Sequence, residues 1–208
     1  MIVIVDYGVG NLFSLASSLS AIGAETIISS KAEDIISADK IILPGVGAFG
    51  DAIQKLNDTG LVPTILSEVK KGKPLLGICL GMQLLFEKSY EYGEHQGLGL
   101  IKGEVKDLKE DLVANGFDYK VPEMGWNALK FHNPSPLFKY IKEGDFVYFV
   151  HSYHAVGCEQ SLTASTEYGV RVTAAVQNGN VFGAQFHPEK SGEVGLNILR
   201  AFCEEGNI

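Results

Sequence analysis

Lys73-Pro-Leu-Leu-Gly-Ile-Cys-Leu-Gly-Met-Gln-Leu-Leu-Phe86 is the most informative stretch of the chain. Its apolar run over 75–78 predicts a buried strand, and an amphipathic helix is expected to follow Cys79, over 80–87. One glycine stands two residues before the cysteine and another two residues after it. This spacing is typical of a nucleophile elbow, in which small residues let a strand and a helix pass close together around a strained turn.

Such an elbow would present the sulfur of Cys79 beyond the edge of the sheet. The backbone N–H of Leu80 would face the same space, where it is a candidate donor to an oxyanion. The start of the helix would favour the thiolate. A lone cysteine is otherwise most often a small buried hydrophobic residue. A base elsewhere in the chain is needed to decide between these two interpretations.

Short apolar runs alternate with helical patterns through the first half of the chain. Strands are expected at 2–5, 26–29, 40–44 and 75–78, with helices at 12–22, 32–36, 48–56 and 61–71. This alternation predicts a doubly wound, flavodoxin-like α/β fold, whose mostly parallel central sheet is flanked by helices. Active sites of such sheets lie at the carboxyl ends of the strands, where Cys79 and the loop Gly45-Val-Gly47 both fall.

The pattern changes after about Leu98, where helical periodicity fades. Strands are expected at 98–108, 126–131, 145–153, 162–168 and 170–176, and the pair Asn178-Gly179 is typical of a hairpin turn. We expect mixed or antiparallel strands here, then a core strand over 181–186 and a closing helix over 191–204. A single domain over 1–208 is expected, because this length supports one core and no linker or repeat interrupts it.

The composition is that of an ordinary globular protein, with 46% hydrophobic and 20% charged residues. A net charge of −8 argues against nonspecific binding of nucleic acid or of an anionic membrane. Three widely spaced cysteines, without a Cys/His cluster, argue against a disulfide framework or a metal site. No signal-peptide pattern or membrane-spanning run is found, so we expect a cytoplasmic protein. We also expect that the protein needs no cofactor.

A candidate base follows the late apolar strand, at His187-Pro-Glu189. Residues two apart in an extended segment point to the same side, so the imidazole and the carboxylate should be neighbours. A carboxylate on one ring nitrogen fixes the tautomer and leaves the other nitrogen to take a thiol proton. On its own, a His-x-Glu sequence is most often a surface pair; with Cys79 it predicts a Cys–His–Glu triad.

The combined motifs closely resemble the class I, triad-type glutamine amidotransferases. They stand here as Pro44-Gly-Val-Gly47, Gly77-Ile-Cys-Leu-Gly-Met-Gln83 and Gln185-Phe-His-Pro-Glu-Lys190. Within that class, three further segments resemble the glutaminase subunits of imidazole glycerol phosphate synthases, enzymes of histidine biosynthesis. These segments are Asp6-Tyr-Gly-Val-Gly-Asn11, Pro122-Glu-Met-Gly-Trp-Asn127 and Tyr148-Phe-Val-His-Ser-Tyr153. The likeness covers the whole chain, and no catalytic position departs from the pattern.

The resemblance implies a role for each matching residue. Cys79 would attack the side-chain amide of glutamine, His187 would act as base and acid, and Glu189 would orient the imidazole. The oxyanion would be held by the N–H of Leu80 and by a backbone N–H in the loop at Val46 and Gly47. The positions that match the glutamine-binding residues of the family are Gly47, Gln83, Glu91, His151 and Ser152.

The resemblance also implies a protein partner. Ammonia released into solvent would be protonated and lost as a nucleophile, and this family delivers it to a separate (β/α)8-barrel cyclase subunit. That partner makes imidazole glycerol phosphate and AICAR, and the two chains form a heterodimer. The residues expected at the interface are Met124, Trp126, Tyr148 and Lys190.

Three alternatives stay open at the level of sequence. The chain could be the glutaminase subunit of a paralogous synthase, such as one that aminates a surface sugar, in which case only the partner would differ. It could be a noncatalytic scaffold on the same fold, although the intact Cys79, His187 and Glu189 argue against this. It could also be a general cysteine hydrolase, although Gln83 and the order of the His-Pro-Glu motif argue against that.

Overall fold

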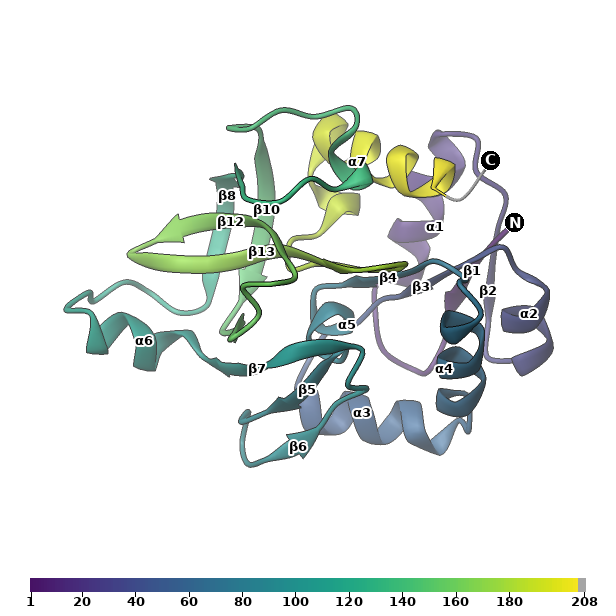
Figure 1. The fold of residues 1–208 in the computed structure, drawn as a ribbon, viewed down its shortest axis with the longest axis horizontal. Helices are drawn as coiled ribbons and strands as arrows, with labels where there is room; N and C mark the ends of the chain where they lie inside the picture. The colour runs from purple at the N-terminus through teal and green to yellow at the C-terminus, as the bar shows by residue number, and fades with distance from the viewer. Residues whose placement is uncertain (206–208) are drawn as a thin grey trace.

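A mostly parallel sheet lies at the centre of the computed structural model, which describes residues 1–205 (Figure 1). Five strands run parallel and lie side by side in the order β2 (Thr26–Ser29), β1 (Ile2–Val5), β3 (Lys40–Leu43), β4 (Leu75–Ile78) and β14 (Val181–Ala184). This is the strand order of a flavodoxin-like sheet. The predicted α/β fold is therefore confirmed.

Three antiparallel strands extend this sheet beyond β14. They are β13 (Val170–Asn178), β12 (Leu162–Tyr168) and β9 (Lys130–Phe131). The hairpin predicted at Asn178-Gly179 joins β13 to β14, with Asn178 paired to Val181. The hairpin matters for function because it returns the chain into the parallel half, directly beside β4.

The inner parallel strands β1, β4 and β14 are apolar at every position because both of their faces are covered. In β1, Ile2 and Ile4 pack in the cluster formed with α1 (Leu12–Ala21) and α7 (Gly192–Glu204), whereas Val3 and Val5 pack in the cluster that includes α3 (Phe49–Asp58) and α4 (Val62–Lys70). The short α2 (Ala32–Ser37) joins this second layer. Figure 1 shows α1 and α7 on one side of the sheet and α3 and α4 on the other. Each fully buried aliphatic side chain contributes roughly 1.5–3 kcal/mol.

Two smaller sheets hold the remaining strands of the described residues. One has four strands in the order β11 (Tyr153–Val156), β7 (Ile101–Asp107), β5 (Phe86–Ser89) and β6 (His95–Gln96). The other pairs β10 (Phe146–His151) with β8 (Glu123–Ala128) in antiparallel fashion. Only Ser152 separates β10 from β11, so the chain crosses from one small sheet to the other at that residue.

Two helices differ from the sequence prediction. The helix expected over 80–87 is wrong in length: α5 (Leu80–Gln83) stops early, because Phe86 begins strand β5 and pairs with Ile101. The sequence analysis also missed α6 (Leu108–Ala114), whose first turn is capped by the side chain of Asp107. The expected strand over 98–108 accordingly starts at 101 and ends at 107. Two 3-10 turns, η1 (Pro136–Phe138) and η2 (Pro188–Lys190), complete the described elements.

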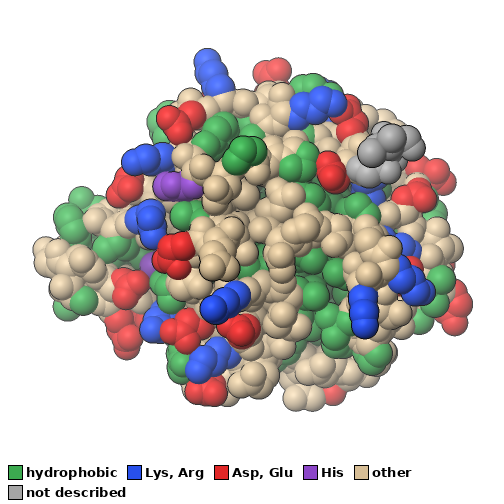
Figure 2. Space-filling model, viewed as in Figure 1, with side chains coloured by type: hydrophobic (Ala, Val, Ile, Leu, Met, Phe, Trp, Pro, Cys, Tyr) green, Lys and Arg blue, Asp and Glu red, His purple; other side chains and the backbone are tan. Residues whose placement is uncertain are grey.

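The surface mixes charges of both signs. Figure 2 shows Lys and Arg side chains interspersed with Asp and Glu across the face seen there, without a broad basic region. Within residues 1–205, none of the helices combines the length and the apolar character that a bilayer crossing requires.

Candidate active site

Cys79 occupies a strained turn directly after β4. Its φ of 54° and ψ of −112° lie in a region that residues with a side chain rarely adopt, and such strain concentrates at functional sites. Two glycines permit the turn. A Cβ at Gly81 would lie 1.8 Å from the carbonyl oxygen of Leu43, and a Cβ at Gly77 would lie 2.6 Å from the carbonyl oxygen of Gly81. The backbones of β3, β4 and α5 therefore meet at a distance that only glycine allows.

His187 is paired with both expected partners. Its Nδ1 lies 2.8 Å from Oε1 of Glu189, and both side chains are almost completely buried. The imidazole and the sulfur of Cys79 line the same pocket, and the interaction with Cys79 raises the pKa of His187. Because a carboxylate only accepts hydrogen bonds, an ionised Glu189 keeps the proton on Nδ1 and leaves Nε2 for the sulfur. The structure thus brings Cys79, His187 and Glu189 together in the predicted order.

The electrostatics of this group favour a protonated imidazole. Burial of the ring opposes its charge, but the hydrogen bonds and charges of Cys79 and Glu189 outweigh burial and raise the pKa of His187 to about 9. An imidazolium at neutral pH stabilises a thiolate beside it and holds a proton for a leaving group.

The base is fixed by backbone contacts with strand β10. The N–H of His187 donates to the carbonyl of Tyr148 at 2.9 Å. The hydroxyl of Ser191 donates to the carbonyl of His187 at 2.6 Å and accepts from the N–H of Tyr148 at 3.0 Å. Movement of β10 near Tyr148 would therefore move the catalytic imidazole.

A pocket of about 330 Å³ opens beside the sulfur of Cys79. Its lining includes all the residues expected to hold the oxyanion and the glutamine, together with the nucleophile and the base: Val46, Gly47, Cys79, Leu80, Gln83, Glu91, His151, Ser152 and His187. Four lining residues were not expected there: Pro122, Val150, Tyr153 and Lys190, the last of which was assigned to the partner interface. Glu189 lies outside this pocket, on the far side of the imidazole, and lines a much smaller cavity.

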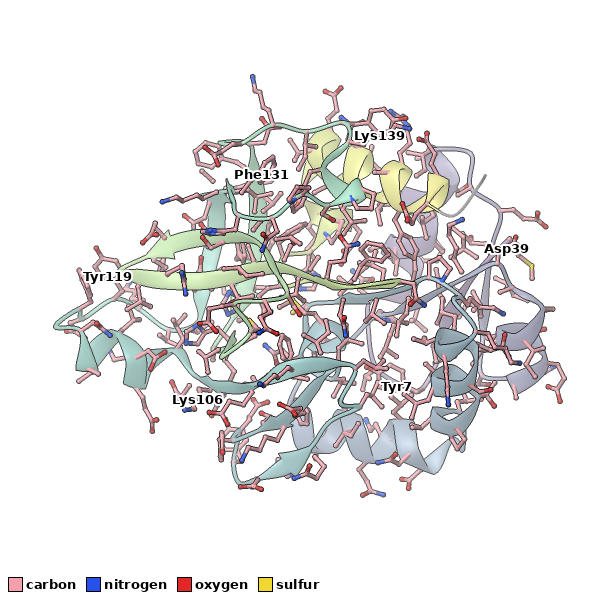
Figure 3. The ribbon with its side chains drawn as sticks, in the orientation of Figure 1. Tyr7, Asp39, Lys106, Tyr119, Phe131 and Lys139 are labelled. Carbon is pink, nitrogen blue, oxygen red and sulfur yellow. The ribbon has the colours of Figure 1, made fainter. Side chains whose placement is uncertain are left out.

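A buried tyrosine holds the loop that was expected to bind the oxyanion. Tyr7, labelled in Figure 3, donates its hydroxyl to the carbonyl of Pro44 at 2.6 Å. Burial, followed by the charge of Cys79, raises the pKa of this phenol far above its ordinary value, so it stays a donor. Gly47 adopts a φ of 94°, which favours glycine. Leu80 is the first residue of α5, so its N–H has no partner inside the helix.

Gln83, which was expected to bind glutamine, lines the pocket and also makes hydrogen bonds within the protein. Its Nε2 donates to the carbonyl of Tyr153 and to Oε1 of Gln185, both at 3.0 Å. Both amide hydrogens are therefore used inside the protein, and only the carbonyl oxygen of Gln83 is left for a ligand. Gln185, to which the sequence analysis gave no role, in turn places its Nε2 3.8 Å from the sulfur of Cys79.

Glu91 provides a buried carboxylate at the wall of the pocket. It accepts the backbone N–H of Phe49 at 2.6 Å. Burial raises the pKa of this carboxyl, while the hydrogen bond from Phe49 partly opposes the rise. A carboxylate in this position is suited to bind an ammonium group, because a cation would compensate for the lost hydration.

The four residues expected at a partner interface also gather in one place. Met124 and Trp126 project from β8 with 63% and 50% of their surfaces exposed. Tyr148 pairs with Trp126 across the two strands, with ring centroids 6.1 Å apart, and Nζ of Lys190 lies 5.9 Å from the ring of Tyr148. Since Lys190 also lines the pocket, this exposed apolar surface is continuous with the site.

The model of one protein family, glutamine amidotransferase class-I, matches residues 3–205. The chain belongs to the class-I glutamine amidotransferases. A protein of Bacillus licheniformis named imidazole glycerol phosphate synthase subunit HisH is 55% identical over 203 residues, covering 97% of this chain and 95% of its own length. The protein of the same name from Wolinella succinogenes is 49% identical over 207 residues, covering 99% of this chain and 100% of its own length. Within its class, the chain thus belongs to the HisH subunit family.

Solved structures resemble the chain in fold at lower identity. A crystal structure of a glutamine amidotransferase superposes with a TM-score of 0.76 at 20% identity and covers 100% of both chains. The structure of PurLQS from Thermotoga maritima superposes with a TM-score of 0.74 at 22% identity, covering 97% of this chain and 96% of its own. Both support the class-I glutamine amidotransferase fold described above.

Proposed function

We propose that Cys79, His187 and Glu189 hydrolyse glutamine and that the ammonia passes to a separate cyclase subunit. The enzyme is a glutamine amidotransferase, the glutaminase subunit of imidazole glycerol phosphate synthase in histidine biosynthesis. The observation that carries the residue assignment is the imidazole of His187, which pairs with Glu189 at 2.8 Å and lines, together with Cys79, a pocket of about 330 Å³.

The first half of the reaction releases ammonia. The thiolate of Cys79 attacks the side-chain amide carbon of glutamine, and the carbonyl oxygen becomes an oxyanion near the N–H of Leu80 and the loop at Val46 and Gly47. The imidazolium of His187 gives its proton to the amide nitrogen as the carbon–nitrogen bond breaks. The products of this step are ammonia, a γ-glutamyl thioester and a neutral imidazole.

The second half releases glutamate. His187 takes a proton from water while the water oxygen attacks the thioester carbon. The carbon–sulfur bond then breaks and returns the thiolate of Cys79 beside an imidazolium. The new carboxyl group of glutamate loses its proton to solvent. Glu189 stays ionised throughout, keeping the imidazole oriented and stabilising its positive charge.

Glutamine is oriented by groups at the opposite wall of the pocket. In this proposal Glu91 binds the α-ammonium group, and the backbone at Gly47, His151 and Ser152 binds the rest of the amino acid. Gln83 contributes by holding the carbonyl of Tyr153, and so the neighbouring backbone, in place. With the amino-acid end of glutamine bound at that wall, its side-chain amide is the part that reaches Cys79.

The partner is proposed to be a (β/α)8-barrel cyclase, bound as a heterodimer over Met124, Trp126, Tyr148 and Lys190. Exposed Met and Trp side chains are enriched at protein interfaces, and Trp is the residue most often found to dominate binding energy. Continuity of this surface with the pocket through Lys190 would let a bound partner receive ammonia without its passage through solvent. Relatives about half identical over their full length favour this partner over that of a paralogous synthase.

The test is glutamate release from glutamine by the pure chain, alone and mixed with the cyclase subunit of the same organism and its ribonucleotide ligand. We expect a large rise in the mixture, abolished by Cys79→Ala and retained by Cys158→Ala, a matched change at a buried cysteine that lines no part of the glutamine pocket. Fast turnover that the cyclase leaves unchanged would contradict the partner. No turnover in either sample, or full activity of Cys79→Ala, would contradict the triad.

A further inference from the structure

A second buried histidine–carboxylate pair lies beside the glutamine pocket. The register of β8 and β10 places Glu123 directly opposite His151. Glu123 is completely buried, and its Oε2 lies 3.2 Å from Nε2 of His151, whose side chain is only 3% exposed. Among residues 1–205 neither of these two atoms has another hydrogen-bond partner, although they lie close to each other. Neither residue takes part in the triad.

The contacts of the imidazole fix its proton. Nδ1 of His151 lies 3.0 Å from the carbonyl oxygen of Tyr153, which can only accept, so Nδ1 carries a hydrogen. Nε2 then faces Oε2 of the Glu123 carboxyl group across 3.2 Å. The side-chain amide of Asn127 donates to the other oxygen, Oε1, at 2.5 Å, which keeps the carboxyl group in place.

His151 closes the corner at which the chain leaves β10 for β11. The ring spans this corner, because His151 ends β10 and Tyr153 begins β11. All three corner residues, His151, Ser152 and Tyr153, line the glutamine pocket. The same carbonyl of Tyr153 accepts from Gln83, which continues through Gln185 to the sulfur of Cys79. A buried carboxyl group thus stands at one end of a chain of contacts that ends at the nucleophile.

We propose that Glu123 is a positioning residue for glutamine, acting through the ring of His151 to hold the 151–153 corner in its binding geometry. Glu123 itself touches no substrate, since it does not line the pocket. Its loss frees the ring to rotate and the corner to move, which weakens glutamine binding. The contacts among Cys79, His187 and Glu189 stay in place, so the chemical step is largely spared. The inference rests on the proposed glutaminase function.

The test compares substitutions of Glu123 in the presence of saturating cyclase subunit. Glu123→Leu keeps much of the volume but removes the contact, and we expect KM for glutamine to rise on the order of tenfold with little change in kcat. Glu123→Gln keeps a donor toward Nε2 of His151 and an acceptor for Asn127, so it should restore most of the wild-type KM. An unchanged KM in Glu123→Leu would overturn the proposal.

Another histidine–carboxylate pair, His154 with Asp111, provides a matched control. His154 is also buried, and its Nε2 lies 2.8 Å from Oδ2 of Asp111, but neither residue lines the glutamine pocket. Asp111→Leu should therefore leave KM unchanged. If it raised KM as much as Glu123→Leu does, the effect would be general loosening and the proposal would fail. Absence of wild-type turnover would instead contradict the proposed function.

A measurement that does not need Glu123→Leu covers the case in which that variant does not fold. Nitrogen-15 NMR of the His151 ring reports which nitrogen carries the proton. We expect a protonated Nδ1, hydrogen-bonded to the carbonyl of Tyr153, and a large change in the Nε2 signal in Glu123→Gln. A neutral ring protonated at Nε2 alone would overturn the proposal, since Nδ1 could not then hold the corner.

Discussion

The backbone N–H of Cys79 donates to the carbonyl oxygen of Ala184 at 2.7 Å. This bond extends the parallel ladder between β4 and β14 by one step beyond the pair Ile78–Ala184. His187 follows Ala184 by three residues. Cys79 and His187, the proposed nucleophile and base, are distant in sequence, and the ends of two adjacent core strands bring them together. Their relative position therefore depends on the packed sheet, which holds catalytic groups more accurately than loops do.

Gly81→Ala should destabilise the protein because a Cβ there would meet the carbonyl oxygen of Leu43 at 1.8 Å. Relief of that contact requires β3 and α5 to separate, and we expect a loss of about 3 kcal/mol or more in the free energy of unfolding. Urea denaturation measures it. Gly60→Ala is the control: Gly60 has a positive φ, which Gly81 does not, but open space surrounds the new Cβ, so a loss of only about 1–2 kcal/mol is expected. Equal losses would contradict the steric explanation of the elbow.

Glu189→Gln should lower turnover roughly 10²–10⁴-fold, less than Cys79→Ala, because the third member of a triad orients and does not attack. It should also change the pH profile. The pKa of His187 is about 9, so wild-type activity should fall as pH rises through that value and the imidazole loses the proton needed by the leaving group. Without the carboxylate that pKa is lower, and the alkaline fall should move to lower pH.

The control for this profile is Glu193→Gln, which removes an exposed carboxylate near the start of α7 and should leave the alkaline fall in place. An alkaline limit shared by Glu189→Gln and the wild type would contradict the role of Glu189. The same raised pKa links the pair to stability. Its contribution is fully present below the ordinary histidine value of 6.5 and is lost as pH rises through about 9.

Glu91→Gln tests the proposed contact with the α-ammonium group of glutamine. Loss of a charge-assisted hydrogen bond should raise KM about 10–100-fold with little change in kcat, while the amide oxygen can still accept from Phe49. Burial raises the pKa of Glu91, so wild-type KM should rise as pH falls through that pKa and the carboxylate is protonated. The variant should lack this dependence. Glu94→Gln, a nearby exposed change, should behave as wild type.

The parallel half of the fold could be predicted because its signals are local. Each strand is a short run of apolar residues, and the covered faces explain why no polar position interrupts β1 or β3 except Lys40. The end of α5 could not be predicted in the same way. Phe86 continues an apolar pattern compatible with a helix, and only its pairing with Ile101 on a distant strand turns it into β5. Nonlocal pairing of this kind overrides local preference.

The residues of the site likewise fall into those with local sequence signals and those that depend on nonlocal pairing. Cys79, His187 and Glu189 stand in local motifs whose spacing has a chemical reason, so the sequence alone could propose them as a triad. The hydrogen bonds of Gln83 and the pairing of Glu123 with His151 depend on strand register and on sheet-to-sheet packing, which no local spacing encodes. The expected single domain and the cytoplasmic location stay predictions.

Trp126→Ala tests the proposed partner surface. Half of this side chain is exposed on β8, so its loss should change the free energy of unfolding little. Its removal from a binding interface should cost about 2 kcal/mol, which is roughly a 30-fold rise in Kd for the cyclase subunit by titration calorimetry. The control is Ile36→Ala, an equally exposed apolar residue on α2, which should leave Kd unchanged. If the two variants bound the cyclase equally well, the partner would have to contact a different face, and the continuity of the Met124–Trp126 surface with the pocket through Lys190 would have no role in ammonia transfer.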